Sequence, residues 1–181
     1  MQDTRINQST LELIQPRLDL EAEFMAMVEE FRANGENRFD SETGLNKNDF
    51  PAYVRFLEDG ARGIVPEGLV PWSAFWLMGH NNQSVIGVSS LRPRLSPFLE
   101  YQGGHIGYAV RPSRRRQGYG TLILQMTLEK AKQLGLERVL VVCHTDNIAS
   151  VRVIEHNGGQ FENEVTPEGE KPISRYWIDL V

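Results

Sequence analysis

The hydrophobic and polar positions of the chain predict helices and strands that follow each other in mixed order. Apolar residues recur at helical spacing over 19–33, with Asp19 as the expected N-cap and Gly35 as the expected C-terminal stop. A second helix is predicted over 48–58. The glycines and prolines of 60–71 predict a loop after it.

Runs rich in β-branched and aromatic residues predict the strands, and two more amphipathic stretches predict further helices. Strands are expected over 11–16, 73–80, 84–93, 104–110, 138–143, 160–165 and 173–181, and helices over 118–134 and 148–156. The polar residues His80–Gln83 predict a hairpin between the second and third strands. This order predicts an α/β layered fold with a mixed sheet in one domain, 1–181. It is not a doubly wound Rossmann order, because no helix separates the three central strands.

Composition and charge exclude several classes of protein. Hydrophobic residues make up 40% of the chain and the net charge is -5, which argues against broad attraction to nucleic acid or to a membrane surface. A single cysteine, Cys143, excludes an intrachain disulfide framework. We find no secretory signal and no apolar run of the roughly 18–20 residues that cross a bilayer, so a cytoplasmic protein is expected. The four histidines lack metal-ligand spacing, so no metal is expected.

The stretch VRPSRRRQGYGTLIL, residues 110–124, carries the strongest chemical signal. A predicted strand ends at Val110, four arginines follow within six residues, and Gly118 and Gly120 open a helix. The first turn of a helix has unpaired N–H groups and a positive dipole end, so this stretch predicts a strong anion site. A Walker A loop is excluded because no lysine follows Gly120, and Ile123 stands where a dinucleotide fingerprint needs its third glycine. A merely solvated basic face is the alternative.

The run RRQGYG, residues 115–120, fits the signature Gln/Arg-x-x-Gly-x-Gly/Ala, and here the sequence resembles the GNAT acetyltransferase family. The resemblance extends from about Ala74 to Phe161. The runs GGHIGYAVRPS and DNIASVRVIEHNGG resemble an uncharacterised bacterial subgroup and the ribosomal-protein N-terminal acetyltransferases. The resemblance to this family implies a mostly antiparallel sheet of about six to seven strands flanked by about four helices. It also implies acetyl-CoA as co-substrate, bound by 73–181, with 1–72 as an acceptor-side front end.

The resemblance implies a set of cofactor-binding residues. They are Tyr108, Ala109, Val110, Arg115, Arg116, Gln117, Gly118, Tyr119, Gly120, Thr121, Asn147 and Ser150. The backbone of 108–110 is expected to pair with pantetheine, and a bulge there is expected to splay this strand from 138–143. The loop 115–121 is expected to bind the pyrophosphate, and Arg114 and Arg116 are candidates for the 3′-phosphate.

Acetyl transfer to an amine needs the neutral amine, so a general base is useful. His105 stands where related N-terminal acetyltransferases place a glutamate, and we predict it as the base, with Glu100 in reserve. A sheet histidine with a purely structural role is the alternative. A backbone N–H of Ala109 or Val110 is expected to hold the oxyanion. Ile154 replaces the tyrosine that many family members use to protonate the leaving thiolate.

The leading hypothesis is N-acetyl transfer to a primary amine of a small molecule or peptide. The alternatives are transfer of a longer acyl group, transfer to a small-metabolite amine rather than to a protein terminus, and a non-catalytic acyl-CoA-binding or regulatory domain. A nucleic-acid-binding protein rests only on the arginines. The aromatic residues Trp72, Phe75 and Trp76 either line an acceptor pocket or belong to the core. The identity of the amine and the oligomeric state, including a homodimer, stay open.

Overall fold

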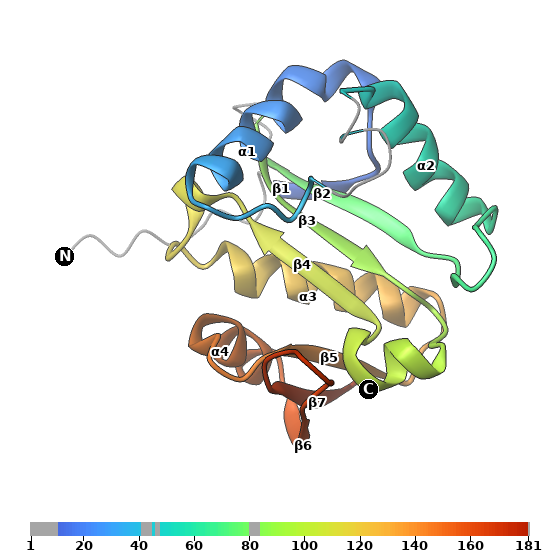
Figure 1. Cartoon of the computed structure of the whole chain (residues 1–181), viewed down its shortest axis with the longest axis vertical. Helices are drawn as coiled ribbons and strands as arrows, with labels where there is room; N and C mark the ends of the chain where they lie inside the picture. Colours follow the sequence, from blue (N-terminus) through green and yellow to red (C-terminus); the bar gives the residue numbers. More distant parts are fainter. Residues whose placement is uncertain (1–10, 41–44, 46–47, 80–83, 181) are drawn as a thin grey trace.

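A seven-stranded sheet forms the centre of the molecule (Figure 1). The computed structural model describes residues 11–40, 45, 48–79 and 84–180, so the predicted connection His80–Gln83 lies outside the described residues. The strands are β1 (Leu11–Ile14), β2 (Ser73–Gly79), β3 (Val85–Leu91), β4 (Ile106–Val110), β5 (Arg138–His144), β6 (Gln160–Val165) and β7 (Ile173–Asp179). Their order is β1-β2-β3-β4-β5-β7-β6, and among these strands only the β4–β5 pair is parallel. The predicted α/β fold with a mixed, mostly antiparallel sheet is confirmed.

Helices cover both faces of this sheet (Figure 1). The α-helices of the described ranges are α1 (Glu21–Ala33), α2 (Phe50–Arg62), α3 (Tyr119–Gln133) and α4 (Ile148–His156). Helices α1 and α2 lie on one face, where Phe24 stacks on Trp76 with ring centroids 4.6 Å apart. On the other face α3 packs on β4 and β5 through a buried cluster that includes Ile106, Leu124 and Val141. A π-helical turn, Leu99–Gly103, occupies part of the predicted loop before β4.

The ends of α1 show which local signals were reliable. Gly35 ends the helix as predicted: its φ is 77° and its N–H donates to the Arg32 carbonyl at 2.9 Å. Asp19 is not the N-cap, because its carboxylate binds the Arg17 guanidinium at 2.9 Å instead. A 3₁₀ turn, Leu18–Leu20, leads into α1, and no side chain caps it.

Helix α2 extends to Arg62, beyond the predicted end at 58, and Gly60 lies inside it. A Cβ at Gly60 would meet Trp72 Cε2 at 2.5 Å, so this glycine lets the indole pack directly on the helix backbone. Gly63, with φ of 80°, is the residue that ends the helix. The prediction of a loop starting at 60 was wrong because close packing, rather than helix breaking, explains this glycine.

Strands β4 and β5 diverge after a short contact. Their register contains one pair, Ile106 with Val141, whereas β3 and β4 pair over five consecutive positions without a register shift. The expected divergence of the two strands is therefore present. The expected bulge in β4 is not seen in its register with β3, so β4 and β5 diverge without a bulge there.

Candidate functional site

The loop between β4 and α3 has the backbone shape of an anion site. Arg116 and Gly118 both have positive φ, 62° and 87°, and α3 begins at Tyr119 without a side-chain cap. The first N–H groups of a helix have no intrahelical acceptor, and residues with positive φ turn successive N–H groups to one side. By contrast, the side chain of Asn147 caps α4 by accepting from the Ser150 N–H at 3.1 Å. The start of α3 thus keeps donors for a ligand.

A cavity of about 890 Å³ lies beside this helix start, and we call it the loop cavity. Most of the predicted binding residues contribute to its lining: Tyr108, Ala109, Val110, Arg115, Arg116, Gly118, Gly120, Thr121, Asn147 and Ser150. Gln117 and Tyr119 are not part of its lining. The Gln117 side chain donates to the Ser113 carbonyl at 3.2 Å, and Tyr119 packs beside the buried Ile123. The lining also includes Arg152, a basic residue of α4 that sequence reasoning missed.

Arg115 holds the loop in place through contacts within the protein. Its guanidinium makes two hydrogen bonds to the Glu36 carboxylate, at 2.7 and 2.8 Å, and its Nε donates to the Val110 carbonyl at 3.1 Å. It also lies 5.3 Å from the centroid of the Phe31 ring. The hydrogen bond from Arg115 lowers the pKa of Glu36, against the effect of burial. Glu36 therefore offsets the charge of Arg115, whereas Arg116, the next residue of the same loop, is exposed at the cavity.

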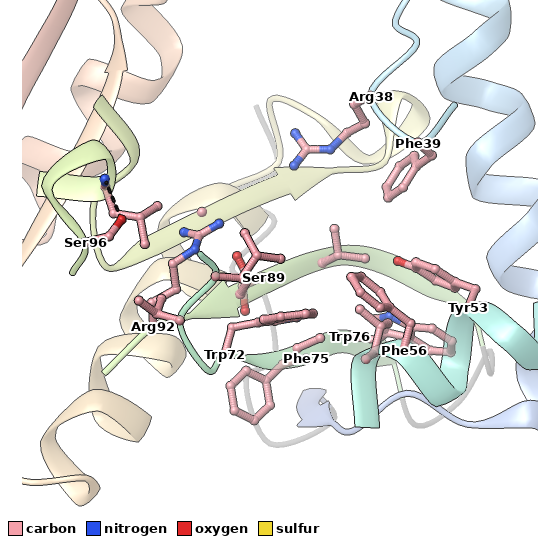
Figure 2. A pocket seen from close by; sticks show the side chains of 18 of the residues that line it. Arg38, Phe39, Tyr53, Phe56, Trp72, Phe75, Trp76, Ser89, Arg92 and Ser96 are labelled. Atoms are coloured by element: carbon pink, nitrogen blue, oxygen red, sulfur yellow. Dashed lines mark hydrogen bonds between the residues drawn. The ribbon is translucent and has the colours of Figure 1, made fainter. Parts of the chain in front are cut away.

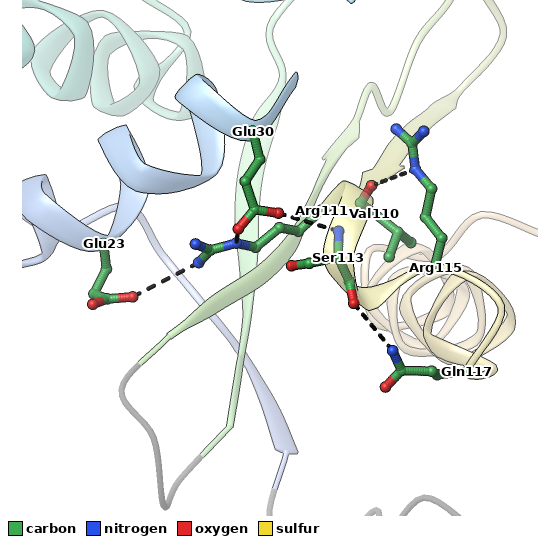
Figure 3. Close-up of polar contacts among 7 residues, drawn as sticks. All are labelled: Glu23, Glu30, Val110, Arg111, Ser113, Arg115 and Gln117. Atoms are coloured by element: carbon green, nitrogen blue, oxygen red, sulfur yellow. Dashed lines mark hydrogen bonds and ion pairs between the residues drawn. The ribbon is translucent and has the colours of Figure 1, made fainter. Parts of the chain in front are cut away.

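Arg111 is held by α1 in a similar way (Figure 3). Its Nε donates to Glu30 Oε1 at 2.6 Å, the Ser113 N–H donates to Glu30 Oε2 at 3.1 Å, and Glu23 lies 3.8 Å from the guanidinium. Burial acts to raise the pKa of Glu30, but the hydrogen bonds from Ser113 and Arg111 outweigh it and keep this pKa below its ordinary value. Glu30 of α1 and Glu36, three residues beyond its end, therefore hold the two ends of the basic loop, which the sequence alone did not indicate.

A second cavity, of about 510 Å³, lies between α2 and the sheet, and we call it the aromatic cavity. Trp72, Phe75 and Trp76 contribute to its wall, although Trp76 is almost fully buried and also belongs to the core. Figure 2 shows further aromatic side chains along the same wall, together with Arg92 and Arg38. The polar residues of its described lining are Arg38, Tyr53, Ser89, Ser90, Arg92 and Ser96, and Arg38 also lines the loop cavity. The two cavities therefore meet at Arg38.

His105 is not part of the described lining of either cavity. Its Nδ1 accepts a hydrogen bond from the Leu140 N–H at 2.9 Å, and its ring lies 6.1 Å from that of Trp177. Burial, followed by the charge of Arg92, lowers the pKa of His105, while a backbone hydrogen bond at Leu140 acts in the opposite direction. A neutral imidazole whose Nδ1 accepts a hydrogen bond carries its proton on Nε2, so it has no free lone pair. This geometry does not support His105 as the base.

Strand alternation does not determine the direction of the His105 side chain, because His105 precedes the strand. Strand β4 begins at Ile106, after Gly104 with φ of 67°, and the His105 N–H donates to the Leu140 carbonyl at 2.7 Å. The reserve candidate Glu100 is exposed in the π-helical turn and also lies outside the described linings. Ile154 is fully buried and faces the core.

The pairing of β4 decides which N–H groups face the diverging strands. The Arg111 N–H donates to the Ile86 carbonyl and the Arg92 N–H donates to the His105 carbonyl, so odd-numbered residues of β4 face β3. Ala109 therefore directs its N–H to β3, which corrects its assignment as an oxyanion donor. The N–H groups of Tyr108 and Val110 point to the side where β5 diverges.

Two titratable side chains beside the loop cavity remain protonated at neutral pH. Burial raises the pKa of Cys143 to about 11 and that of Tyr108 to about 12. The Tyr108 hydroxyl is buried and has no hydrogen bond of normal geometry, although the nearby Ser150 side chain acts to lower its pKa. A protonated thiol is a poor nucleophile, so Cys143 does not favour a covalent intermediate.

Two further kinds of feature are absent from the described ranges. No helix there is long and apolar enough to span a bilayer. The same residues contain no group of three His, Cys, Asp or Glu side chains placed to hold a metal ion.

Comparisons with known proteins agree with this fold. Residues 13–160 match the model of the family described as acetyltransferase (GNAT) domain. The chain is 29% identical over 91 residues to the uncharacterized N-acetyltransferase YnaD of Bacillus subtilis (strain 168). That match covers 46% of this chain and 54% of YnaD, so the chain spans about half the length of the curated relative that it matches.

Two solved structures share the fold over nearly the whole chain. One is RimL, a ribosomal L7/L12 alpha-N-protein acetyltransferase in complex with coenzyme A, with a TM-score of 0.69 and 20% identity over 96% of this chain and 97% of that one. The other is a spermidine N-acetyltransferase SpeG chimera from Vibrio cholerae and hSSAT, with a TM-score of 0.65 and 14% identity over 95% and 96%. At these identities the likeness establishes the fold alone.

Proposed function

Because the chain belongs to the GNAT acetyltransferase family, we propose that it transfers an acetyl group from acetyl-CoA to a primary amine. One observation carries the proposal: the uncapped start of α3, with Gly118 in a left-handed conformation, opens on a cavity of about 890 Å³. A pyrophosphate is the anion that suits a row of free helix N–H groups. The complex of the RimL structure with coenzyme A supports the same cofactor here.

The residues of the loop cavity fit this cofactor in a definite order. The N–H groups of Gly118–Thr121 bind the pyrophosphate, and Arg116 and Arg152 are the cations available to the outer phosphate. The backbone of Tyr108 and Val110 binds the pantetheine where β4 diverges from β5. Asn147 is already engaged as the cap of α4, so its amide N–H groups, rather than its oxygen, are offered to the ligand.

Transfer then proceeds directly from thioester to amine. The neutral amine attacks the carbonyl carbon, the new C–N bond replaces the C–S bond, the nitrogen loses a proton and the thiolate gains one. The Val110 N–H stabilises the oxyanion. The thiolate needs no dedicated acid, because a thiol pKa of about 8.5 makes it a tolerable leaving group. This agrees with the buried Ile154 at the usual tyrosine position.

Deprotonation of the amine does not need His105. Arg38, at the junction of the two cavities, is a like charge that disfavours an ammonium and lowers its pKa. Solvent then accepts the proton from the amine. In this scheme α2 and Trp72 contribute one wall of the acceptor site, and most of the cofactor-binding residues lie within 73–181.

Ligand-induced stabilisation tests the cofactor, and turnover tests the reaction. Coenzyme A at about 100 times its Kd adds about 2.7 kcal/mol, which corresponds to roughly 5–11 °C in Tm for a chain of this size. Acetyl-CoA should also release free thiol in the presence of an acceptor amine. An unchanged Tm at millimolar coenzyme A refutes the cofactor assignment. A full Tm shift without thiol release across a panel of amines identifies a non-catalytic acyl-CoA-binding domain instead.

A further inference from the structure

The aromatic cavity indicates which class of amine the chain accepts, which family membership alone does not determine. We infer that the acceptor is a small-molecule amine that also bears a carboxylate and an apolar or aromatic group. This rests on the proposed function, and it names the substrate class of the same site. The cavity volume of about 510 Å³ lies in the range of small-molecule sites rather than of extended peptide grooves.

The charge of the lining is the first observation. Among the described residues, the charged side chains that line the aromatic cavity are Arg38 and Arg92, and no aspartate or glutamate lines it. A polyamine remains positively charged near neutral pH, so this lining repels it. An acceptor with a carboxylate is attracted to the same two arginines instead.

The position of Arg92 is the second observation. It is half-buried just beyond the end of β3, and its guanidinium contacts the Gly104 carbonyl at 3.4 Å. A guanidinium has five N–H donors, so it can bind a carboxylate through two of them in addition to its contacts within the protein. Ser90 and Ser96 line the cavity as well and can donate to the same anion.

The aromatic wall is the third observation. The Trp72 indole is fixed against the backbone of α2 at Gly60, and its ring centroid lies 4.9 Å from that of Phe56. Phe98, which is exposed, extends the apolar part of the wall, whereas Phe75 is buried in the core cluster that includes Leu124. Trp72, Phe56 and Arg92 line the same cavity (Figure 2). An apolar or aromatic side chain of the acceptor therefore packs on the rings while its carboxylate binds Arg92.

A matched amine panel tests the inference. Thiol release from acetyl-CoA is measured with phenylalanine and phenethylamine, with tryptophan and tryptamine, with spermidine, and with a phenylalanyl tripeptide amide. In each pair kcat/KM should be at least tenfold higher for the compound with the carboxylate. Equal or faster turnover of the decarboxylated partner, of spermidine or of the peptide overturns the inference while the acetyltransferase assignment stands.

Variants of the lining separate binding of the carboxylate from stability. Arg92→Gln should reduce the preference for the carboxylate at least tenfold, mainly through KM, while the Tm shift with coenzyme A stays intact. Arg92→Lys should restore part of it. Arg94→Gln is the control, because Arg94 is exposed and lies outside the described lining. If Arg92→Gln and Arg38→Gln both keep the wild-type preference, the inference is wrong.

A readout without turnover keeps the two hypotheses distinct. Phenylalanine titrated into the protein with coenzyme A should change tryptophan fluorescence, because Trp72 lines the cavity. Phenethylamine should do so only at concentrations at least tenfold higher. A saturable change with phenylalanine but no thiol release supports the inference and contradicts the proposed reaction. No fluorescence change with phenylalanine, together with turnover of other amines, contradicts the inference and supports the proposed reaction.

Discussion

The Glu30 carboxylate ties α1 to the loop that precedes α3, and its removal should weaken both the fold and cofactor binding. Glu30 accepts from Arg111 Nε at 2.6 Å and from the Ser113 N–H at 3.1 Å, and only 14% of the Arg111 side chain is exposed. Hydrogen bonds to charged groups contribute about 1.5–3 kcal/mol each. Because Glu30 is 30% exposed and Glu23 lies within 3.8 Å of Arg111, we expect Glu30→Ala to cost about 2 kcal/mol in total.

Glu29→Ala is the matched control on the same helix. Glu29 also binds an arginine, Arg32, at 2.6 Å, but its side chain is 64% exposed and Arg32 keeps a second partner in Asp40 at 2.8 Å. Exposed ion pairs of this kind contribute about 0.2–1 kcal/mol. We expect Glu29→Ala to fall near the lower end of that range and to leave the loop unchanged.

Thermal and urea denaturation with and without coenzyme A measure both effects. A cost of about 2 kcal/mol lowers the Tm of Glu30→Ala by roughly 4–8 °C, and the shift induced by coenzyme A should shrink as well. Equal destabilisation by Glu30→Ala and Glu29→Ala contradicts the argument that the less exposed Glu30–Arg111 contact is the stronger of the two. If Glu30→Ala is destabilised but keeps the full Tm shift with coenzyme A, the contact of Glu30 with Arg111 is not coupled to the anion site.

Three further variants, one of them with a matched control, test the site and its pH dependence. Gly118→Ala should cost about 1 kcal/mol because of its φ of 87°, and it should also abolish most of the Tm shift induced by coenzyme A. The control Gly135→Ala, with φ of 80° at the other end of α3, should show only the loss of stability. Equal coenzyme A shifts in the two variants mean that the loop is misassigned. His105→Gln should leave the pH dependence of kcat/KM unchanged, and loss of a titration step would restore His105 as the base. The lowered pKa of His105 favours its neutral form in the fold, so its contribution to stability is present above pH 6.5 and declines as pH falls below it; the unfolding free energy of His105→Gln should lack this decline. The lowered pKa values of Glu30 and Glu36 add a separate loss of stability below about pH 4.5, which Glu30→Gln should reduce in acid titrations of the unfolding free energy.

Local signals allowed much of the fold and the uncapped start of α3 to be predicted. Glycines with positive φ, such as Gly35 and Gly118, mark helix ends through a conformation that few other residues adopt. The near-continuous apolar run of β5 indicated a strand covered on both faces. These features depend on a few neighbouring residues, so one sequence is enough to recognise them.

The contacts that the sequence did not reveal join distant segments. Arg111 and Glu30 are 81 residues apart, and Arg115 and Glu36 are 79 residues apart. Nothing in the spacing of charges indicates which glutamate meets which arginine, because the pairing follows from how α1 packs on the sheet. His105 illustrates another limit: its direction depends on where β4 begins, and a displacement of one residue decides whether alternation applies to it.

The segment around the C-terminal end of α1 takes part in both halves of the proposed reaction. Glu36 and Phe31 hold Arg115 beside the loop cavity, and Arg38, two residues further on, lines both cavities. A shift of the segment that carries Glu36 and Arg38 therefore changes both the position of the cofactor loop and the position of the Arg38 charge at the acceptor cavity. The division at residue 72 consequently separates segments of the chain rather than steps of the reaction, since removing α1 would leave the half-buried Arg111 without Glu30.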